Sequence, residues 1–486
     1  RGASVIVYPV ISFALGLLLF YLLVRELFGN ATAAYSTLFL AIIPSYLYRT
    51  IAGFSDKEAL GLAFLFLSLY CFVKTLKQGH WAWALSAGVA TGLMGLTWGG
   101  FKFLLIIIAG TTLFLFLVKE NNMMFTYGLW MITFTLMLGL LTDKYGGFMG
   151  LLTSSTSGFV YLVFIILVVH PYLKPYVKHI PVRLPGQVIT LIALVLLGSG
   201  AGYVLLGQAS IVELASDMTG MLTAGLSTNR LGLTVSENRQ PFFGTWLSTF
   251  GIVYFTLFIG GILLLVKRMT EETEEYPKPV LFVAGYFLAS MLLSRLSAQH
   301  LMNGETIASQ LFFLSGFVVA ATYLGYVYLS RYRHQKDIFV SYSTIRAEHV
   351  LMLFWLITML LAARGGVRLF ILLAPVTAIM AGYLLQVGFR KALEQKETIA
   401  RYAGLGALLL FIIPYAFIVF NSSFASAQAT GPSFTPQWRS AMDWVKENTP
   451  QHAVFAHWWD YGYWVQTQGQ RATITDGGNF IPYWNH

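Results

Sequence analysis

The chain contains 486 residues, of which 57% are hydrophobic and only 11% are charged. Soluble domains are roughly 45–50% apolar and about 25% charged, so this composition excludes a single soluble globule and a disordered chain. The formal net charge of +10 does not call for nucleic acid, because Lys and Arg gather in the cytoplasmic loops of membrane proteins. We expect a multi-pass integral membrane protein in contact with membrane lipid, with no nucleic-acid partner. The one cysteine, Cys71, excludes an internal disulfide and a cysteine metal site.

Apolar segments that approach the roughly 20 residues of a transmembrane helix recur along most of the chain. They lie at about 4–24, 31–48, 59–76, 81–97, 101–118, 124–142, 148–169, 187–207, 242–266, 279–294, 305–330, 348–363, 366–388 and 402–420. Several of these 14 segments are short or interrupted by glycine. We therefore expect 12 to 14 transmembrane helices and an all-α polytopic membrane fold.

The Lys and Arg residues between the segments divide unequally when successive connections are assigned to alternate sides. The side that holds Lys74 and Lys77 carries 18 of them, and the side that holds Arg49 and Arg368 carries nine. The first side is therefore expected to be cytoplasmic. An even number of spans then puts both ends of the chain, and the loops at 49–58 and 208–241, on the extracytoplasmic side.

The chain becomes polar after residue 421. We expect 1–421 to form the transmembrane domain and 422–486 to begin an extracytoplasmic soluble domain of mixed α/β structure. Residues 436–448 are expected to form an amphipathic helix that ends before Pro450, and 453–455 to form a strand. The loop at 208–241 is longer than the roughly 12–15 residues of most unstructured connections, which indicates a functional or disordered segment.

The most specific motif is Trp458-Trp459-Asp460-Tyr461-Gly462. Its aromatic rings surround one carboxylate, and its glycine permits a sharp turn. Indole N–H groups and carboxylate oxygens can hydrogen-bond the hydroxyl of a small side chain. The alternative is an aromatic patch at the membrane interface, where Trp and Tyr are enriched.

This pentapeptide resembles the signature of the catalytic subunit of oligosaccharyltransferase, and the flanking residues 444–450 and 471–479 are also similar to that family. The resemblance implies a GT-C-like glycosyltransferase that moves an oligosaccharide from a polyprenyl or dolichyl phosphate or diphosphate carrier. The acceptor is the side-chain amide of Asn in an Asn-x-Ser/Thr sequon of a polypeptide, with inversion at the anomeric carbon. Trp458, Trp459, Asp460 and Tyr461 are then expected to bind the Ser or Thr of the sequon.

Asp56 and Glu58 stand two residues apart at the expected start of a helix. Such carboxylates can bind a hard divalent cation, but Asp56 can equally cap the helix while Glu58 lies in its first turn. The oligosaccharyltransferase family has an acidic motif of this kind here, preceded by an arginine. The resemblance implies that Asp56 is a catalytic metal ligand, that Glu58 is a further ligand and that Mn²⁺ or Mg²⁺ is the cofactor. Arg49 is expected either to organise the loop at 49–58 or to cap a helix end.

Glu237, in Thr234–Pro241, resembles the family's Ser/Thr-x-x-Glu motif, which implies a catalytic and metal-binding carboxylate; the alternative is a solvated loop glutamate. Arg364 and Arg368 flank a turn between apolar segments. A planar guanidinium can contact two phosphate oxygens, and the resemblance implies that Arg368 binds the donor phosphate. Arg364 is expected to snorkel to the headgroups.

The family begins with a further span and an outer loop that carries another acidic motif. We expect this sequence to start after that loop, so that one carboxylate of the metal site would come from upstream. The family has fewer spans than our upper count, so one helical pair is expected to be broken or re-entrant.

Two other function classes compete with this hypothesis. Another lipid-sugar-dependent membrane glycosyltransferase would share the acidic outer loops but would not need the aromatic-flanked Asp460. A transporter would place its polar site near the bilayer midplane between related halves, and the sequence shows no internal duplication. The sequence leaves accessory subunits open and favours a prokaryotic cell membrane over the endoplasmic reticulum membrane.

Overall fold

The computed structural model describes residues 2–52, 54, 56–119, 123–177, 184–206, 235–273, 277–335, 342, 344–429 and 434–476. The chain divides into two compact units. The first comprises Arg1–Thr228 and Val235–Phe420, and the second comprises Asn421–His486 with Asn229–Thr234. Each unit is described by itself.

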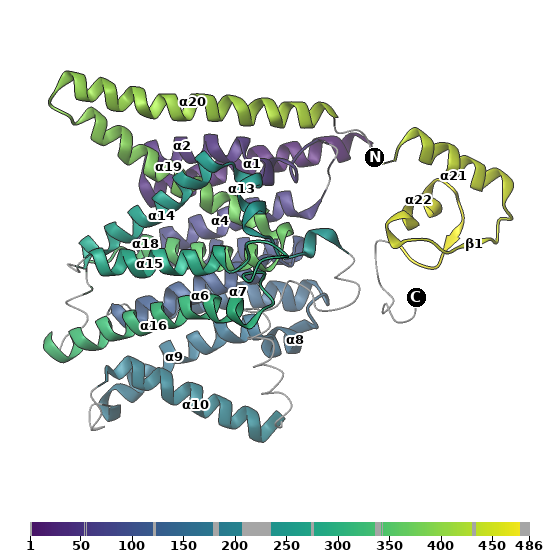
Figure 1. Ribbon diagram of the computed structural model, residues 1–486. Helices are drawn as coiled ribbons and strands as arrows, with labels where there is room; N and C mark the ends of the chain where they lie inside the picture. Colours follow the sequence, from purple (N-terminus) through teal and green to yellow (C-terminus); the bar gives the residue numbers. More distant parts are fainter. Residues whose placement is uncertain are drawn as a thin grey trace. The chain divides into compact units, whose positions relative to one another are not determined.

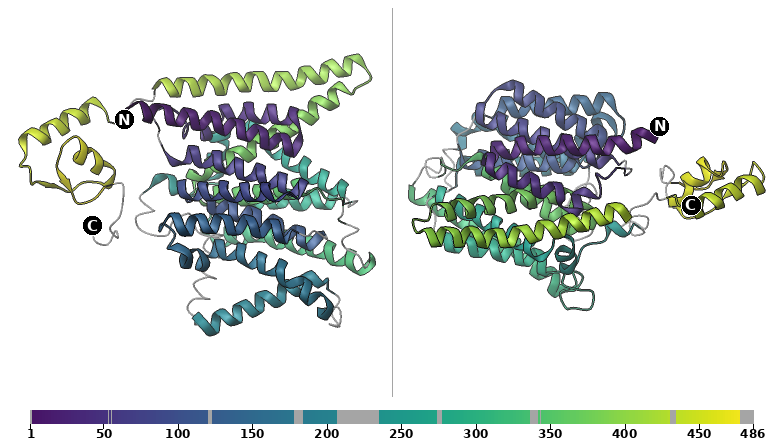
Figure 2. Two further views of the ribbon diagram at one scale, coloured as in Figure 1. Left: turned by 180° about the vertical axis from the view of Figure 1, so that it is seen from behind. Right: turned by 90° about the horizontal axis from the view of Figure 1, so that it is seen from above.

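The first unit is a bundle of helices that run roughly parallel and antiparallel to one another (Figures 1 and 2). Its α-helices are α1 (Gly2–Phe28), α2 (Asn30–Ile42), α3 (Pro44–Leu47), α4 (Lys57–Gln78), α5 (Trp81–Thr97), α6 (Phe101–Val118), α7 (Met124–Leu141), α8 (Gly147–Thr153), α9 (Ser155–Val177), α10 (Gly186–Leu206), α13 (Phe243–Phe250), α14 (Ile252–Glu272), α15 (Pro277–Leu293), α16 (Ile307–Gln335), α18 (Ala347–Gly365), α19 (Phe370–Leu393) and α20 (Thr398–Ala429). Two 3₁₀ turns, η1 (Ser236–Asn238) and η2 (Val367–Leu369), complete the described elements.

The helices confirm the prediction of an all-α polytopic membrane fold. Each predicted apolar segment lies on helix, and among the described residues ten helices are long and apolar enough to span a bilayer. Two shorter apolar helices, at Gly186–Gly200 and Pro277–Leu293, add to these.

Three of the predicted segments are not continuous helices, although the sequence led us to expect only one broken or re-entrant pair and did not locate it. The segment at 31–48 breaks between α2 and α3, where Pro44 cannot donate a backbone hydrogen bond. The segment at 148–169 breaks at Ser154, between α8 and α9. The segment at 242–266 breaks at Gly251, whose φ of 74° lies outside the helical region.

Helices α5 and α7 pack closely because one face of α5 carries glycines. A Cβ atom at Gly88 would lie 2.6 Å from the Thr133 side chain, and one at Gly92 would lie 2.7 Å from the sulfur of Met137. Small residues at this spacing let helix backbones approach inside a membrane. The buried Thr91 hydroxyl of α5 links this pair of helices to α4. It accepts a 3.0 Å hydrogen bond from the Trp130 indole of α7, and it shares a 2.8 Å hydrogen bond with the Ser68 hydroxyl of α4.

The charged side chains of the bundle gather at its two ends. At one end Lys74 pairs with Glu26 at 2.8 Å and Lys77 pairs with Glu348 at 3.3 Å. Arg49 and Arg368, which the sequence assigned to the other side, contact Asp56 and Glu58 at the opposite end of α4.

The second unit contains α21 (Pro436–Asn448), β1 (Val454–Phe455), η3 (Trp459–Tyr461), α22 (Gly462–Thr467) and β2 (Ala472–Thr473). The helix covers the residues predicted for it, and Thr435 caps its first turn. The two strands pair in parallel, with Val454 opposite Ala472. Met442, Val445 and Val465 form the buried core between α21 and α22.

Candidate active site

Asp56 and Glu58 occupy the first turn of α4. The Asp56 carboxylate caps the helix by accepting a 2.7 Å hydrogen bond from the Lys57 backbone N–H, which is the structural alternative considered for this residue. Tyr8 donates to the Asp56 carbonyl at 3.3 Å. Glu58 faces inward, and its side chain is fully buried.

Arg49 connects three carboxylates that are far apart in the sequence. Its guanidinium lies 3.7 Å from Asp56 and 3.4 Å from Glu58. The other terminal nitrogen donates to Glu237, which is 188 positions away along the chain. Arg49 therefore ties the loop before α4 to the segment that contains η1.

Arg368 holds the same carboxylates from a different helix pair. Its Nε and Nη2 atoms both donate to Oε1 of Glu58, at 3.0 and 2.9 Å, and Nη2 lies 3.8 Å from Asp56. Arg368 thus makes two hydrogen bonds to one carboxylate, and its guanidinium is a permanent positive charge because arginine does not lose its proton in proteins.

The Glu237 segment is fixed to the turn that carries Arg368. The backbone N–H of Val367 donates to the Arg239 carbonyl at 3.0 Å, so η1 and η2 lie side by side. Arg49, Asp56, Glu58, Glu237 and Arg368 thus form one cluster, which we call the carboxylate–arginine cluster. Of the predicted outer loop, residues 207–234 lie outside the described part of the chain.

Three carboxylates and two guanidiniums leave the carboxylate–arginine cluster with a formal charge of −1. Carboxylate oxygen is the donor that Mn²⁺ and Mg²⁺ prefer, and the Glu58 Oε2 atom is buried without a hydrogen bond. Within the described residues, however, no group of three or more His, Cys, Asp or Glu side chains is arranged around a common metal position. Glu58 is fully buried, whereas Asp56 and Glu237 expose 28% and 48% of their side chains. These two have oxygens that an incoming cation can reach.

Two further arginines lie at this end of the bundle and were not singled out as a pair from the sequence. Arg364 donates to the Ser294 hydroxyl at 3.0 Å and stacks on Phe313, 3.8 Å from the ring centre. Its side chain is buried, so it does not snorkel as expected. Arg295 donates to Gln240 at 2.6 Å. The sequence analysis named Arg364 but not Arg295, which belongs to no motif and could have been indicated only by the expense of a charge at membrane depth.

The second unit carries the aromatic motif on η3. Asp460 and Trp458 are exposed, and Tyr461 packs on Trp438 with ring centres 4.7 Å apart. Within the described residues, the Trp459 indole N–H is buried and has no hydrogen-bond partner. A buried donor without a partner is costly, so a hydrogen-bond acceptor brought to this N–H would be stabilising.

Gly462 serves close packing in the structure, not a sharp turn as the sequence suggested. Its φ and ψ of −54° and −47° suit any residue. A Cβ atom would clash with the Thr475 carbonyl and lie 2.6 Å from the Asp476 Cα atom. The glycine therefore lets the chain after β2 run directly beside the motif.

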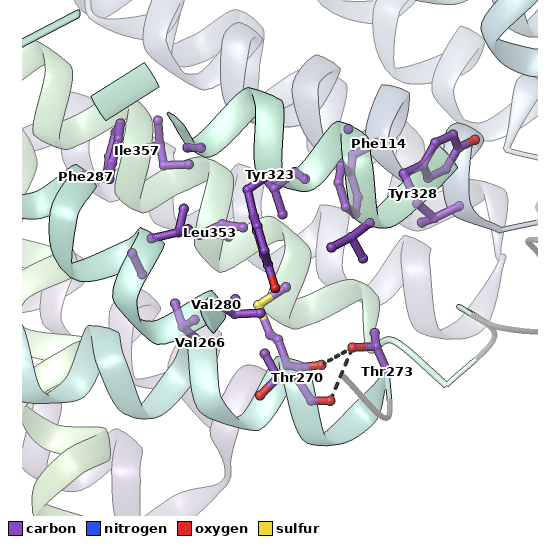
Figure 3. A pocket seen from close by; sticks show the side chains of 18 of the residues that line it. Phe114, Val266, Thr270, Thr273, Val280, Phe287, Tyr323, Tyr328, Leu353 and Ile357 are labelled. Carbon is purple, nitrogen blue, oxygen red and sulfur yellow. Dashed lines mark hydrogen bonds between the residues drawn. The ribbon is translucent and has the colours of Figure 1, made fainter. Parts of the chain in front are cut away.

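A cavity of about 500 Å³ lies within the bundle, away from the carboxylate–arginine cluster. Figure 3 shows its largely apolar wall, with Phe114, Phe287, Leu353 and Ile357 among the side chains that point into it. None of the predicted site residues lines it, so it is not the candidate active site.

The helical bundle, with ten described helices long and apolar enough to cross a membrane, defines a polytopic membrane protein. The chain belongs to the STT3 family, because residues 1–263 match the family described as "Oligosaccharyl transferase STT3, N-terminal". This confirms the family resemblance found in the sequence.

Similar proteins agree with that assignment. The subunit STT3B of dolichyl-diphosphooligosaccharide–protein glycosyltransferase from Oryza sativa subsp. japonica is 23% identical over 95% of this chain and 59% of its own length. Dolichyl-phosphooligosaccharide-protein glycotransferase 1 from Pyrococcus furiosus is 34% identical over 22% of this chain and 11% of its own. The chain spans about 59% of the rice relative.

Solved structures share the fold. The apo oligosaccharyltransferase of Archaeoglobus fulgidus superposes with a TM-score of 0.68, covering 98% of this chain and 54% of its own at 18% identity. The same archaeal enzyme, AglB, in complex with an inhibitory peptide and a dolichol-phosphate gives 0.67 with the same coverage and identity. A complex of that enzyme with Zn and sulfate gives 0.57, covering 98% of this chain and 51% of its own at 17% identity.

Proposed function

We propose that the protein of which this chain is part transfers an oligosaccharide from a lipid-linked phosphate or diphosphate donor to the Asn amide of Asn-x-Ser/Thr sequons. The observation that carries the proposal is the carboxylate–arginine cluster, which gathers Arg49, Asp56, Glu237 and Arg368 from three separate parts of an STT3-family bundle. The relatives named above act on dolichyl-linked oligosaccharides, which supports this donor class.

The acceptor nitrogen needs help, because an amide lone pair is conjugated with its carbonyl. A carboxylate that accepts hydrogen bonds from the amide N–H groups favours a twisted, less conjugated amide. Glu237 is the candidate for this role, because it is the most exposed carboxylate of the cluster and Arg49 holds it in place. The amide nitrogen attacks the anomeric carbon opposite the phosphate, so the C–N bond forms as the C–O bond breaks and the configuration inverts. The phosphate leaves as an anion, and the Glu237 carboxylate takes up the proton that the nitrogen loses.

Arg368 is the candidate for binding the donor phosphate. Glu58 orients the guanidinium through Nε and Nη2, while a third of the Arg368 side chain remains exposed. Planar guanidinium groups bind phosphate through paired hydrogen bonds. This arrangement would stabilise the negative charge of the leaving group without reorganisation during the reaction.

Asp56 and Glu237 would hold a Mn²⁺ or Mg²⁺ ion. The ion would supply Lewis-acid stabilisation of the phosphate oxygens. Glu58 is proposed to position Arg368 and not to bind the metal ion as the resemblance implied, because its side chain is buried and forms an ion pair with Arg368. Arg49 organises the loop and keeps the carboxylates from repelling one another.

The Ser or Thr of the sequon is proposed to bind Trp458, Trp459, Asp460 and Tyr461. The unpartnered Trp459 N–H and the exposed Asp460 carboxylate supply a donor and an acceptor for one hydroxyl. Such a site rejects a peptide that lacks the hydroxyl, because its polar groups would then be buried unpaired. We place these sites on the extracytoplasmic side of the membrane, by the charge count, and favour a prokaryotic cell membrane.

Glycan transfer by the full-length protein tests this proposal. Membranes that contain the lipid-linked donor are supplied with Asn-Ala-Thr and Asn-Ala-Ala peptides in the presence and absence of a chelator. We expect transfer to the Thr peptide alone, loss of transfer with chelator and its recovery with Mn²⁺ or Mg²⁺. Glu237→Gln should lower kcat by at least roughly 100-fold, the usual scale for removing one catalytic group.

Asp143→Asn is the matched control, because Asp143 is an exposed carboxylate in a loop outside the carboxylate–arginine cluster. It should leave transfer unchanged. Equal activity of wild type and Glu237→Gln, or transfer to free sugars instead of peptides, would contradict the proposal.

A further inference from the structure

The hairpin between α15 and α16 is a rigid element at the same end of the bundle as the carboxylate–arginine cluster. The Leu296 N–H donates to the Met302 carbonyl at 2.6 Å, and Arg295 and Asn303 form an antiparallel bridge. The Asn303 side chain then accepts hydrogen bonds from the backbone N–H groups of residues 305 and 306, at 2.8 and 3.0 Å. These hydrogen bonds give the backbone N–H groups of the turn before α16 their partners and fix the geometry of the turn.

Arg295 projects from this hairpin onto the segment that follows Glu237. Its Nη1 atom donates to the Gln240 side chain at 2.6 Å, and its guanidinium lies 4.8 Å from the centre of the Phe242 ring. Its carbonyl accepts a 2.7 Å hydrogen bond from the Phe243 N–H. Arg295 therefore contacts Gln240, Phe242 and Phe243.

The hairpin makes room for that side chain at Gly304. Gly304 has a φ of 92°, which side chains rarely adopt, and a Cβ atom there would clash with Nη1 of Arg295. The Gly304 N–H donates to Ser309 at 2.8 Å, which keeps the glycine backbone in place. The position of Arg295 is thus built into the turn.

Arg295 has no ion pair with a carboxylate within the described residues, although burial lowers its pKa from its ordinary value. Its Nε atom is buried without a hydrogen bond. A half-buried charge of this kind is expensive, so stability alone does not account for an arginine here. Its directed contacts to Gln240 and Phe242 give it a positional role.

We propose that Arg295 is a positioning residue that holds residues 237–243 so that Glu237 keeps its place in the carboxylate–arginine cluster. Holding this segment in one conformation costs conformational entropy, which its contacts must offset. Arg49 secures it at Glu237, Val367 secures it at Arg239, and Arg295 secures it at Gln240 and beyond. The catalytic consequence rests on the function proposed above, but the positional consequence does not.

Proteolysis tests the position without any assay of activity. Trypsin can cleave after Arg239 only when the segment opens from its partners, and the rate of that cleavage reports the open population. In the full-length protein in detergent, Arg295→Gln should raise the rate of cleavage between Arg239 and Gln240, identified by mass spectrometry, roughly tenfold or more. Gln240→Leu should raise it too, and the double variant should add little to either change.

Leu301→Ala is the control, because Leu301 is exposed on the same hairpin and its side chain has no part in these contacts. It should cleave at the wild-type rate. If Arg295→Gln proves unstable, Gly304→Val, which displaces the Arg295 side chain, and Gln240→Leu give the same comparison. Wild-type cleavage rates in these folded variants would overturn the positional inference.

Kinetics then separate positioning from general destabilisation. Under the proposed transfer reaction, Arg295→Gln should lower kcat roughly tenfold with little change in KM for the acceptor peptide and an unchanged unfolding temperature. Arg295→Lys should recover only part of kcat, because an ammonium lacks the planar fork. If the wild type transfers no glycan, the proposed function is wrong but the positional inference stands. If a variant with rapid cleavage keeps a normal kcat, Arg295 does not act on catalysis through Glu237.

Discussion

At the scale of single residues, Glu58 shows that the carboxylate–arginine cluster is stable because each buried negative charge has a positive partner. A fully buried carboxylate is unfavourable unless it is paired, and Glu58 is paired with Arg368 at 2.9 Å and Arg49 at 3.4 Å. The sequence placed Asp56 and Glu58 correctly at a helix start, and both readings of Asp56, as a cap and as a site residue, are compatible. It could not give the ion pairs, since Arg368 lies 310 positions from Glu58.

Removing Arg368 should therefore destabilise the fold as well as impair donor binding. We expect Arg368→Leu to lower the free energy of unfolding by about 3 kcal/mol, because it leaves a buried charge with one partner fewer. The double variant Arg368→Leu with Glu58→Leu should recover most of that loss, yet remain inactive. Thermal unfolding in detergent measures the stability of the single and the double variant. A double variant as unstable as Arg368→Leu would contradict the buried ion pair as the cause of the destabilisation.

The stability that Arg368 contributes should not change between pH 7 and pH 10. A guanidinium keeps its proton throughout this window in both the folded and the unfolded chain. Arg368 therefore neither releases nor takes up a proton on unfolding, and its contribution does not depend on pH here. The difference in unfolding temperature between wild type and Arg368→Leu should thus stay constant across it, and a steep decrease toward pH 10 would argue against this ion pair.

At the scale of secondary-structure elements, the sequence predicted most helices because apolar length is a strong signal. It missed the breaks at Pro44, Ser154 and Gly251, since composition over some 20 residues conceals one interrupting residue. The close contact of α5 with α7 was not foreseen either. Its cause is the glycine face of α5, which becomes meaningful only when its partner helix is known.

Filling that face should separate the helices. Gly92→Leu would insert a side chain where even a Cβ atom lies 2.7 Å from Met137, and overpacking of this kind costs about 1–3 kcal/mol. Leu85→Ala, on an exposed part of the same helix, should change stability by less. Thermal unfolding that ranks the two variants in the opposite order would show that α5 does not pack as described.

Gly462 makes the corresponding prediction in the second unit. A methyl group at this position would meet the chain at Thr475 and Asp476, so Gly462→Ala should displace the aromatic motif. Hydrogen exchange of residues 462–476 should accelerate, while exchange in the helices of the first unit stays unchanged. Unaltered exchange around the motif would mean that the contact with Thr475 is not needed.

At the scale of the whole molecule, the proposed reaction needs several kinds of binding residue, and each unit of the chain supplies candidates of its own. Glu237 and Arg368 of the first unit are the candidates for the acceptor amide and the donor phosphate. Asp460 of the second unit is the candidate for the sequon hydroxyl. Family membership follows from the matches over the chain.

Photo-crosslinking of one acceptor peptide tests this central claim most directly. A photoreactive amino acid is incorporated in the full-length protein at Asn238, beside Glu237, or at Tyr461, beside Asp460, and each protein is irradiated with a labelled Asn-Ala-Thr peptide. We predict that unlabelled Asn-Ala-Thr, but not Asn-Ala-Ala, suppresses crosslinking at each position. Equal suppression by the two competitors, or no crosslinking at either position, would contradict the proposed recognition of the sequon.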